Sequence, residues 1–226
     1  MVNVAAWQKL HDECARDGVT LVAVSKTKPV SDIEELYALG QRDFGENYVQ
    51  ELVEKQAILP ADIRWHYIGH LQSNKVKFIA PFVQLIHAVD SFKLLLEINK
   101  QAQKFGRIID VLLQMHIASE ETKFGMDERD LVEFFQYYDA QRGELQHVRI
   151  CGLMGMATNT NNEEQIRSEF RALRNVFQNI KRSQFIGQDY FNICSIGMSS
   201  DYETAIEEGG NMIRVGSLLF GERQYH

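Results

Sequence analysis

Short apolar segments alternate with amphipathic segments eight times along this chain, and this alternation constrains the fold most strongly. The short segments are rich in Val, Ile and Leu, which is typical of strands buried on both faces of a parallel sheet. Eight strand–helix repeats is the number that closes a parallel barrel. We therefore predict an α/β fold, a single (β/α)8 TIM barrel with an extra helix over 2–17. The predicted strands lie at 21–28, 43–48, 64–68, 84–89, 108–117, 148–156, 190–196 and 212–219.

Composition gives the expected domain count, partners and compartment. A barrel can occupy all 226 residues undivided, and no Pro-, Gly- or Ser-rich linker interrupts the chain, so we expect one domain over 1–226. A net charge of −7 disfavours binding of nucleic acid by a broad basic surface. No apolar run reaches the length of a membrane span, and the N-terminus lacks the apolar core of a signal peptide. We therefore expect no membrane partner. The three cysteines are far apart, so we also expect no disulfide framework and a cytoplasmic protein.

The first predicted strand ends in a lysine. Val22, Val24 and Lys26 share one strand face by alternation, and catalytic groups of parallel barrels sit at the carboxyl ends of the strands. Burial of a lysine amine disfavours its charged form and leaves more free amine to attack a carbonyl, which would make Lys26 a Schiff-base lysine. The alternative is a lysine that extends from the strand end into solvent.

A polar loop follows the seventh predicted strand. In the stretch 195–201, Gly197 would let the backbone approach a ligand, and the start of the next helix offers free N–H groups beside serine hydroxyls. Ser200 and Glu203 have the spacing of a capping box. The loop is therefore a candidate anion site, and the alternative is an ordinary helix cap.

The eighth predicted strand carries Arg214, Gly216 and Ser217 near its end. Barrels commonly bind phosphate between the loops after strands seven and eight, and the first strand lies next to them once a barrel closes. A phosphate site beside a Schiff-base lysine is the combination that pyridoxal 5′-phosphate (PLP) requires. A structural ion pair at the barrel end is the alternative explanation for Arg214.

Seven motifs across 23–223 resemble those of the pyridoxal-phosphate homeostasis protein family, which is similar to the N-terminal barrel of bacterial alanine racemase, a PLP protein of fold type III. The motifs are AVSKTKP (23–29), FGENYVQE (44–51), WHYIGHLQSNK (65–75), TKFGM (122–126), GLMGMA (152–157), SIGMSSDYETAI (195–206) and IRVGSLLFGER (213–223).

The resemblance implies a role for each site residue. Lys26 should carry PLP as a Schiff base, Arg214 should face the pyridine nitrogen, and Asn47 should lie near the ring. Five residues of the two late loops should hold the phosphate, namely Met198, Ser199, Ser200, Gly216 and Ser217. The segments 159–162 and 223–226 have no role that the resemblance assigns.

The resemblance also implies a part in intracellular PLP (vitamin B6) homeostasis and, indirectly, in amino-acid and keto-acid balance. An arginine at the pyridine nitrogen would keep that nitrogen unprotonated and the ring a weaker electron sink. We therefore expect a carrier or regulator that passes PLP to apo-enzymes and lacks strong catalysis. The family resemblance, and the absence of the second domain of alanine racemase, imply a monomer. Two alternatives remain open: a small fold type III PLP enzyme such as a slow amino-acid racemase, and a barrel that binds another phosphorylated metabolite.

Two histidines, His66 and His70, are four residues apart, as metal ligands on one helix would be. They straddle a predicted strand end and its loop, and no HExxH pattern surrounds them, so we expect no metal site.

Overall fold

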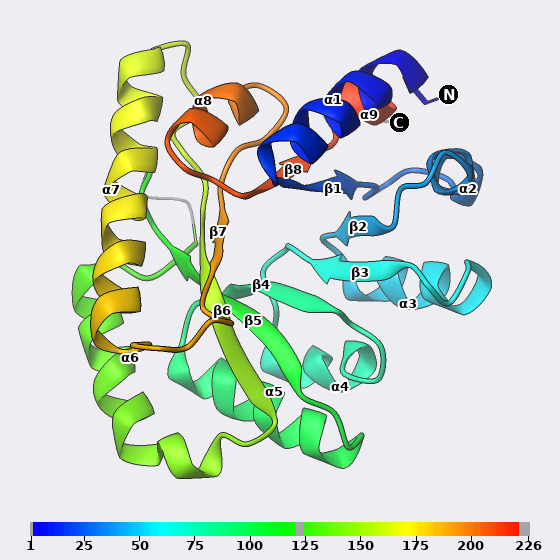
Figure 1. The fold of residues 1–226 in the computed structure, drawn as a ribbon. Coiled ribbons are helices and arrows are strands. Elements are labelled where there is room, and N and C mark those ends of the chain that lie inside the picture. Colours follow the sequence, from blue (N-terminus) through cyan, green and yellow to red (C-terminus); the bar gives the residue numbers. More distant parts are fainter. Residues whose placement is uncertain (1, 121–123, 222–226) are drawn as a thin grey trace.

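The strands form one closed barrel in which each strand is parallel to its neighbours in sequence order (Figure 1). The computed structural model describes residues 2–120 and 124–221. The strands are β1 Thr20–Val24, β2 Asp43–Glu46, β3 Arg64–Tyr67, β4 Leu85–Val89, β5 Ile109–Met115, β6 Val148–Gly155, β7 Ile193–Ser195 and β8 Met212–Val215. This arrangement confirms the predicted (β/α)8 barrel.

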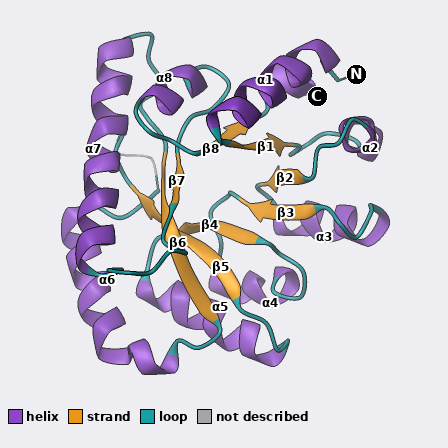
Figure 2. Cartoon of the chain, in the orientation of Figure 1, coloured by secondary structure: helices purple, strands orange, loops and turns teal. Residues whose placement is uncertain are grey.

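The helices surround the outside of the strands (Figure 2), as crossover connections between parallel strands require. They comprise α1 Val4–Asp17, α2 Val30–Ala38, α3 Val49–Ile58, α4 Val76–Ile79, α5 Phe92–Lys104, α6 Glu128–Gln141, α7 Glu163–Ser183, α8 Tyr202–Glu207 and α9 Ser217–Phe220, with short 3-10 turns at Ser73–Lys75 and Arg142–Glu144. The first of them, α1, is the predicted extra helix. Within the described residues, none of these helices is long and apolar enough to cross a membrane.

Alternation along the strands separates two cores. On β1, Leu21 and Ala23 pack in the large cluster between strands and helices, whereas Val22 belongs to a smaller cluster inside the barrel. Similarly, Val111 of β5 points outward and Leu112 inward. Both faces of these strands are therefore buried, which explains why they read as continuous apolar runs.

The last two strands are shorter than predicted. The predicted strand 190–196 begins only at Ile193, because Phe191 leaves the sheet to stack on Phe185 with 4.4 Å between ring centroids. The predicted strand 212–219 ends at Val215, because the carbonyl of Gly216 accepts the N–H of Phe220 and starts α9. The apolar residues beyond these strand ends are used for packing, which periodicity alone does not distinguish from strand.

Gly152 allows β6 and β7 to pair closely, and its replacement should destabilise the barrel. Gly152 lies opposite Ile193, and a Cβ atom on it would overlap the carbonyl oxygen of Ile193. We expect Gly152→Ala to lower the free energy of unfolding in urea by about 3 kcal/mol or to prevent folding, since backbone must move. Gly143→Ala is the matched control, because nothing lies within 4 Å of its added methyl group. Equal stability of the two variants would refute this reading of the β6–β7 contact.

Candidate functional site

A cavity of about 310 Å³ opens at the carboxyl ends of the strands, within the range of small-molecule sites. Its walls come from the end of β1 and from the segments after β2, β3, β6, β7 and β8. All eight residues that the sequence singles out line this one cavity: Lys26, Asn47, Met198, Ser199, Ser200, Arg214, Gly216 and Ser217.

Closure of the barrel brings the two ends of the chain together at this cavity. β8 pairs with β1 in parallel register, with Arg214 opposite Val22 and Val215 opposite Ala23. The strand that carries the arginine is therefore the direct neighbour of the strand that leads to Lys26.

Lys26 lies two residues beyond the end of β1, in a turn that the structure holds at several points. The N–H of Ser25 donates to the carbonyl of Gly45 at 3.0 Å, and the N–H of Lys28 returns to the carbonyl of Ser25 at 3.0 Å. Thr27 has a φ of 63°, a conformation that costs a β-branched residue free energy. Its N–H donates to Glu51 Oε1 at 2.6 Å, which offsets this cost. The lysine is thus presented by a constrained turn and not by a free strand end.

A buried cation that the sequence analysis missed, Lys55 of α3, holds this turn through hydrogen bonds. Lys55 Nζ donates to the carbonyl of Ser25 at 2.7 Å, to Glu46 Oε1 at 2.7 Å and to Glu51 Oε1 at 2.6 Å. The hydroxyl of Ser25 also donates to Glu46 Oε1, at 2.6 Å. Burial raises the pKa of Glu46, and the nearby ammonium of Lys55 opposes that rise. The i,i+4 spacing of Glu51 and Lys55 was the available signal, but it is typical of ordinary surface pairs.

The loops after β7 and β8 are joined by one serine. Ser199 Oγ accepts the N–H of Gly216 at 3.2 Å. The predicted capping box at Ser200 is wrong: α8 has Asp201 as its N-cap, and the Asp201 carboxylate instead accepts the N–H of Met198 at 2.6 Å. Ser200 is consequently left on the cavity wall.

Gly197 lies against α8 and is not among the described residues that line the cavity. Its φ is +92°, and a Cβ atom there would lie 2.6 Å from the Cβ of Ala205 in α8. The missing side chain makes room for this helix, and the expectation that Gly197 also lets the backbone approach a ligand stays a prediction.

Arg214 is buried at the floor of the cavity. Within the described residues, its guanidinium donates to the Ser195 carbonyl at 2.9 Å, to Ser195 Oγ at 2.6 Å and to the Gly155 carbonyl at 3.1 Å. The predicted alternative of an ion pair therefore does not describe its direct contacts. Burial lowers the pKa of the guanidinium to about 10, which still leaves it charged at neutral pH.

Asn47 places an unpartnered polar atom at the cavity. Its Oδ1 is buried and has no hydrogen-bond partner within residues 2–120 and 124–221. Its carbonyl accepts the hydroxyl of Tyr67 at 3.0 Å, which fixes the backbone. A buried acceptor without a donor costs free energy unless a ligand or water supplies the donor.

The two histidines of the third strand region separate in space. His66 Nε2 lies 3.0 Å from Asp43 Oδ1, while His70 stacks on Phe124 and approaches Asp90 at 3.4 Å. In the described part of the chain, no three His, Cys, Asp or Glu side chains are grouped as a metal site. Thr122 and Lys123 of the TKFGM motif and the segment 223–226 lie outside the described residues.

Comparison with known proteins finds relatives that match nearly the whole chain. Residues 4–224 match the family described as alanine racemase, N-terminal domain. A protein of Aquifex aeolicus named pyridoxal phosphate homeostasis protein is 39% identical over 224 residues, covering 96% of this chain and 95% of the relative. The protein of that name from Escherichia coli K12 is 36% identical, covering 94% and 90%.

Two solved structures show the range of similarity. PipY of Synechococcus elongatus, determined with PLP bound, is 38% identical with a TM-score of 0.79, covering 90% of this chain and 93% of PipY. Alanine racemase from Bartonella henselae is 15% identical with a TM-score of 0.68, covering 96% of this chain and 61% of the racemase. The second likeness is one of fold alone.

Removing the ammonium of Lys55 should leave the buried carboxylate of Glu46 without its partner cation. We expect Lys55→Met to lower the free energy of unfolding by about 3 kcal/mol, because Glu46 loses its partner. The loss should shrink in acid, since protonation of Glu46 removes the buried charge. Urea denaturation at neutral and acidic pH measures both effects. Lys104→Met on the exposed face of α5 is the control, and an equally small change in both variants would contradict the role of Lys55.

The free energy of unfolding at acidic pH should depend on the ionisation of Asp43. Burial opposes ionisation, but hydrogen bonds from Arg64 and His66 outweigh it and lower the pKa of Asp43 to about 2 from 3.8. This stabilisation is complete above pH 3.8 and is lost as the pH falls through about 2, and it amounts to about 2 kcal/mol. In denaturation measured across that window, Asp43→Asn should lose this pH dependence, whereas exposed Asp139→Asn should keep it. Parallel curves for wild type and Asp43→Asn would show that the carboxylate is not stabilised this way.

Proposed function

The chain belongs to the pyridoxal phosphate homeostasis protein family, and on that premise we propose that it binds PLP as a Schiff base on Lys26 and acts in PLP homeostasis. The observation that carries the proposal is the meeting of all eight candidate residues around one cavity at the barrel mouth. PLP bound to the PipY relative supports the same assignment.

The donor set fits the chemistry of PLP. Bound PLP supplies an aldehyde, and the amine of Lys26 lines the same cavity as the guanidinium of Arg214. The hydroxyls of Ser200 and Ser217 are suited to phosphate oxygens. The buried, unpartnered Oδ1 of Asn47 is suited to a ligand hydroxyl donor. We assign the phosphate to the loops after β7 and β8 and the ring nitrogen to Arg214.

The remaining walls favour a carrier over a racemase. Racemisation needs an acid or base on each face of the substrate. Among the described lining residues, the titratable groups are Lys26, Lys28 and Arg214, with no carboxylate, imidazole, phenol or thiol. Lys28 Nζ already donates to the carbonyls of Phe220 at 2.8 Å and Gly221 at 3.2 Å. We therefore propose that the protein holds and releases PLP for apo-enzymes without strong catalysis, as a cytoplasmic monomer.

Absorption spectra of the protein titrated with PLP test the site. Wild type should show the violet-region band of a lysine Schiff base, and Lys26→Ala should lose it because the reacting amine is gone. Lys28→Ala is the matched control from the same turn, and it should still form the adduct on Lys26. An unchanged band in Lys26→Ala would overturn the proposal.

Incubation with single amino-acid enantiomers separates carrier from enzyme. The carrier proposal predicts no appreciable racemisation above free PLP. Lys26-dependent racemisation would instead favour the small PLP enzyme. Light scattering in solution tests the monomer, which should have the 26.1 kDa mass of one chain.

A further inference from the structure

A continuous series of hydrogen bonds runs through the barrel interior behind the cavity. Arg214 Nη1 lies 2.6 Å from Ser195 Oγ, which lies 3.3 Å from His87 Nδ1. His87 Nε2 lies 2.9 Å from His66 Nδ1, and His66 Nε2 lies 3.0 Å from Asp43 Oδ1. Ser195 and His87 are wholly inaccessible to solvent. The series comes from β8, β7, β4, β3 and β2, and thus spans the barrel from the cavity floor to the beginning of β2.

With both histidines uncharged, the two ends of the series determine the direction of every bond in it. A guanidinium can only donate, so Ser195 Oγ accepts from Arg214 and its own proton goes to His87 Nδ1. A neutral His87 that accepts at Nδ1 carries its proton on Nε2 and donates to His66 Nδ1. His66 then donates from Nε2 to Asp43, whose carboxylate only accepts. Ser195, His87 and His66 each donate once and accept once, so every group between the two ends is satisfied.

One added proton would give a different arrangement. If His66 were a cation, His87 would have to accept at Nε2 and donate from Nδ1, and Ser195 Oγ would then accept twice and lose the acceptor for its own proton. The charged groups at the two ends are Asp43 with Arg64, and Arg214 with Asp201 nearby. A second buried cation on the same series as Arg214 is unfavourable, and burial, together with the neighbouring His66 and Arg214, lowers the pKa of His87.

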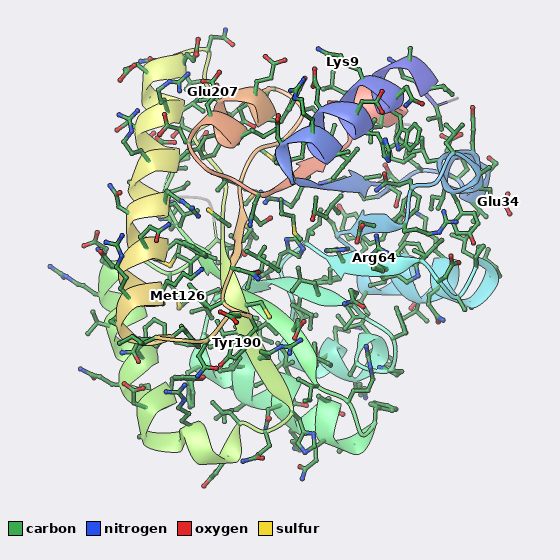
Figure 3. The ribbon with its side chains drawn as sticks, in the orientation of Figure 1. Lys9, Glu34, Arg64, Met126, Tyr190 and Glu207 are labelled. Atoms are coloured by element: carbon green, nitrogen blue, oxygen red, sulfur yellow. The ribbon has the colours of Figure 1, made fainter. Side chains whose placement is uncertain are left out.

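We propose that Ser195 and His87, oriented by His66 and Asp43, are positioning residues that hold the guanidinium of Arg214 in one orientation at the cavity floor. Arginine has a long side chain with several rotamers, and a fixed fork loses less entropy when it meets a ligand. As far as it concerns PLP, this inference rests on the proposed function. The outer end of the series is the Asp43–Arg64 pair, and Figure 3 labels Arg64 on β3.

Histidine nitrogen NMR on the protein without ligand tests the series directly. His87 should carry its proton on Nε2 and accept at Nδ1, and His66 should donate from Nε2 to Asp43. In Asp43→Asn, whose amide can donate, the preference of His66 should weaken or reverse. A His87 protonated on Nδ1 would overturn the inference.

Two substitutions of His87 separate positioning from packing. The Oδ1 of His87→Asn can stand at the place of Nδ1 and accept from Ser195, whereas His87→Gln places its amide nearer to His66. PLP affinity should fall about tenfold in His87→Gln and be largely retained in His87→Asn. The pH dependence of the ligand band should shift in the Gln variant only. His147→Asn is the control, because His147 contacts the Arg107 carbonyl away from this series.

The outcomes distinguish this inference from the proposed function. Correct tautomers in a protein that forms no PLP adduct would leave the series intact and refute the proposed ligand. An adduct whose affinity and pH profile are the same in both His87 variants would refute the positioning role and leave PLP binding intact. Equal stability losses of the two variants without any spectral difference would mean that His87 only fills space.

Discussion

The parallel pairing of β8 with β1 is the contact on which the site depends. It sets Arg214 opposite Val22 and so brings the last strand of the chain beside the turn that carries Lys26. The anion-suited loops after β7 and β8 then face an amine from the first strand across a single cavity. An open sheet with the same elements in the same order would leave these groups at opposite edges.

The barrel interior combines an apolar layer with buried polar groups, most of which have hydrogen-bond partners. Val22, Leu112 and Met154 pack together there, and a series of polar side chains runs past them from Arg214 to Asp43. Lys55 binds Glu46, and Arg214 binds Ser195, so neither cation is without a partner. Burying a charge costs desolvation free energy, which proteins tolerate where the charge serves binding or orientation. Arg214 lines the cavity itself, and Lys55 holds the turn that carries Lys26.

Much of this arrangement could be predicted from the sequence. Apolar strand segments alternate with amphipathic helix segments, and eight such repeats are the number that closes a barrel. The residues at strand ends could be assigned to one mouth for the same reason, although their roles stay predictions. The N-cap of α8 at Asp201 and the contact between Gly197 and Ala205 could not be predicted, since both depend on how α8 packs. Lys55 and His87 were missed because only the folded chain brings buried partners from other strands to them.

The most direct test of the account is borohydride reduction of the PLP-loaded protein followed by peptide mapping. Reduction fixes the Schiff base as a stable amine, so the modified residue can be located by mass spectrometry. The account predicts a single major adduct on Lys26, in the peptide that follows β1. An adduct on Lys28 or on a surface lysine, with Lys26 unmodified, would contradict it.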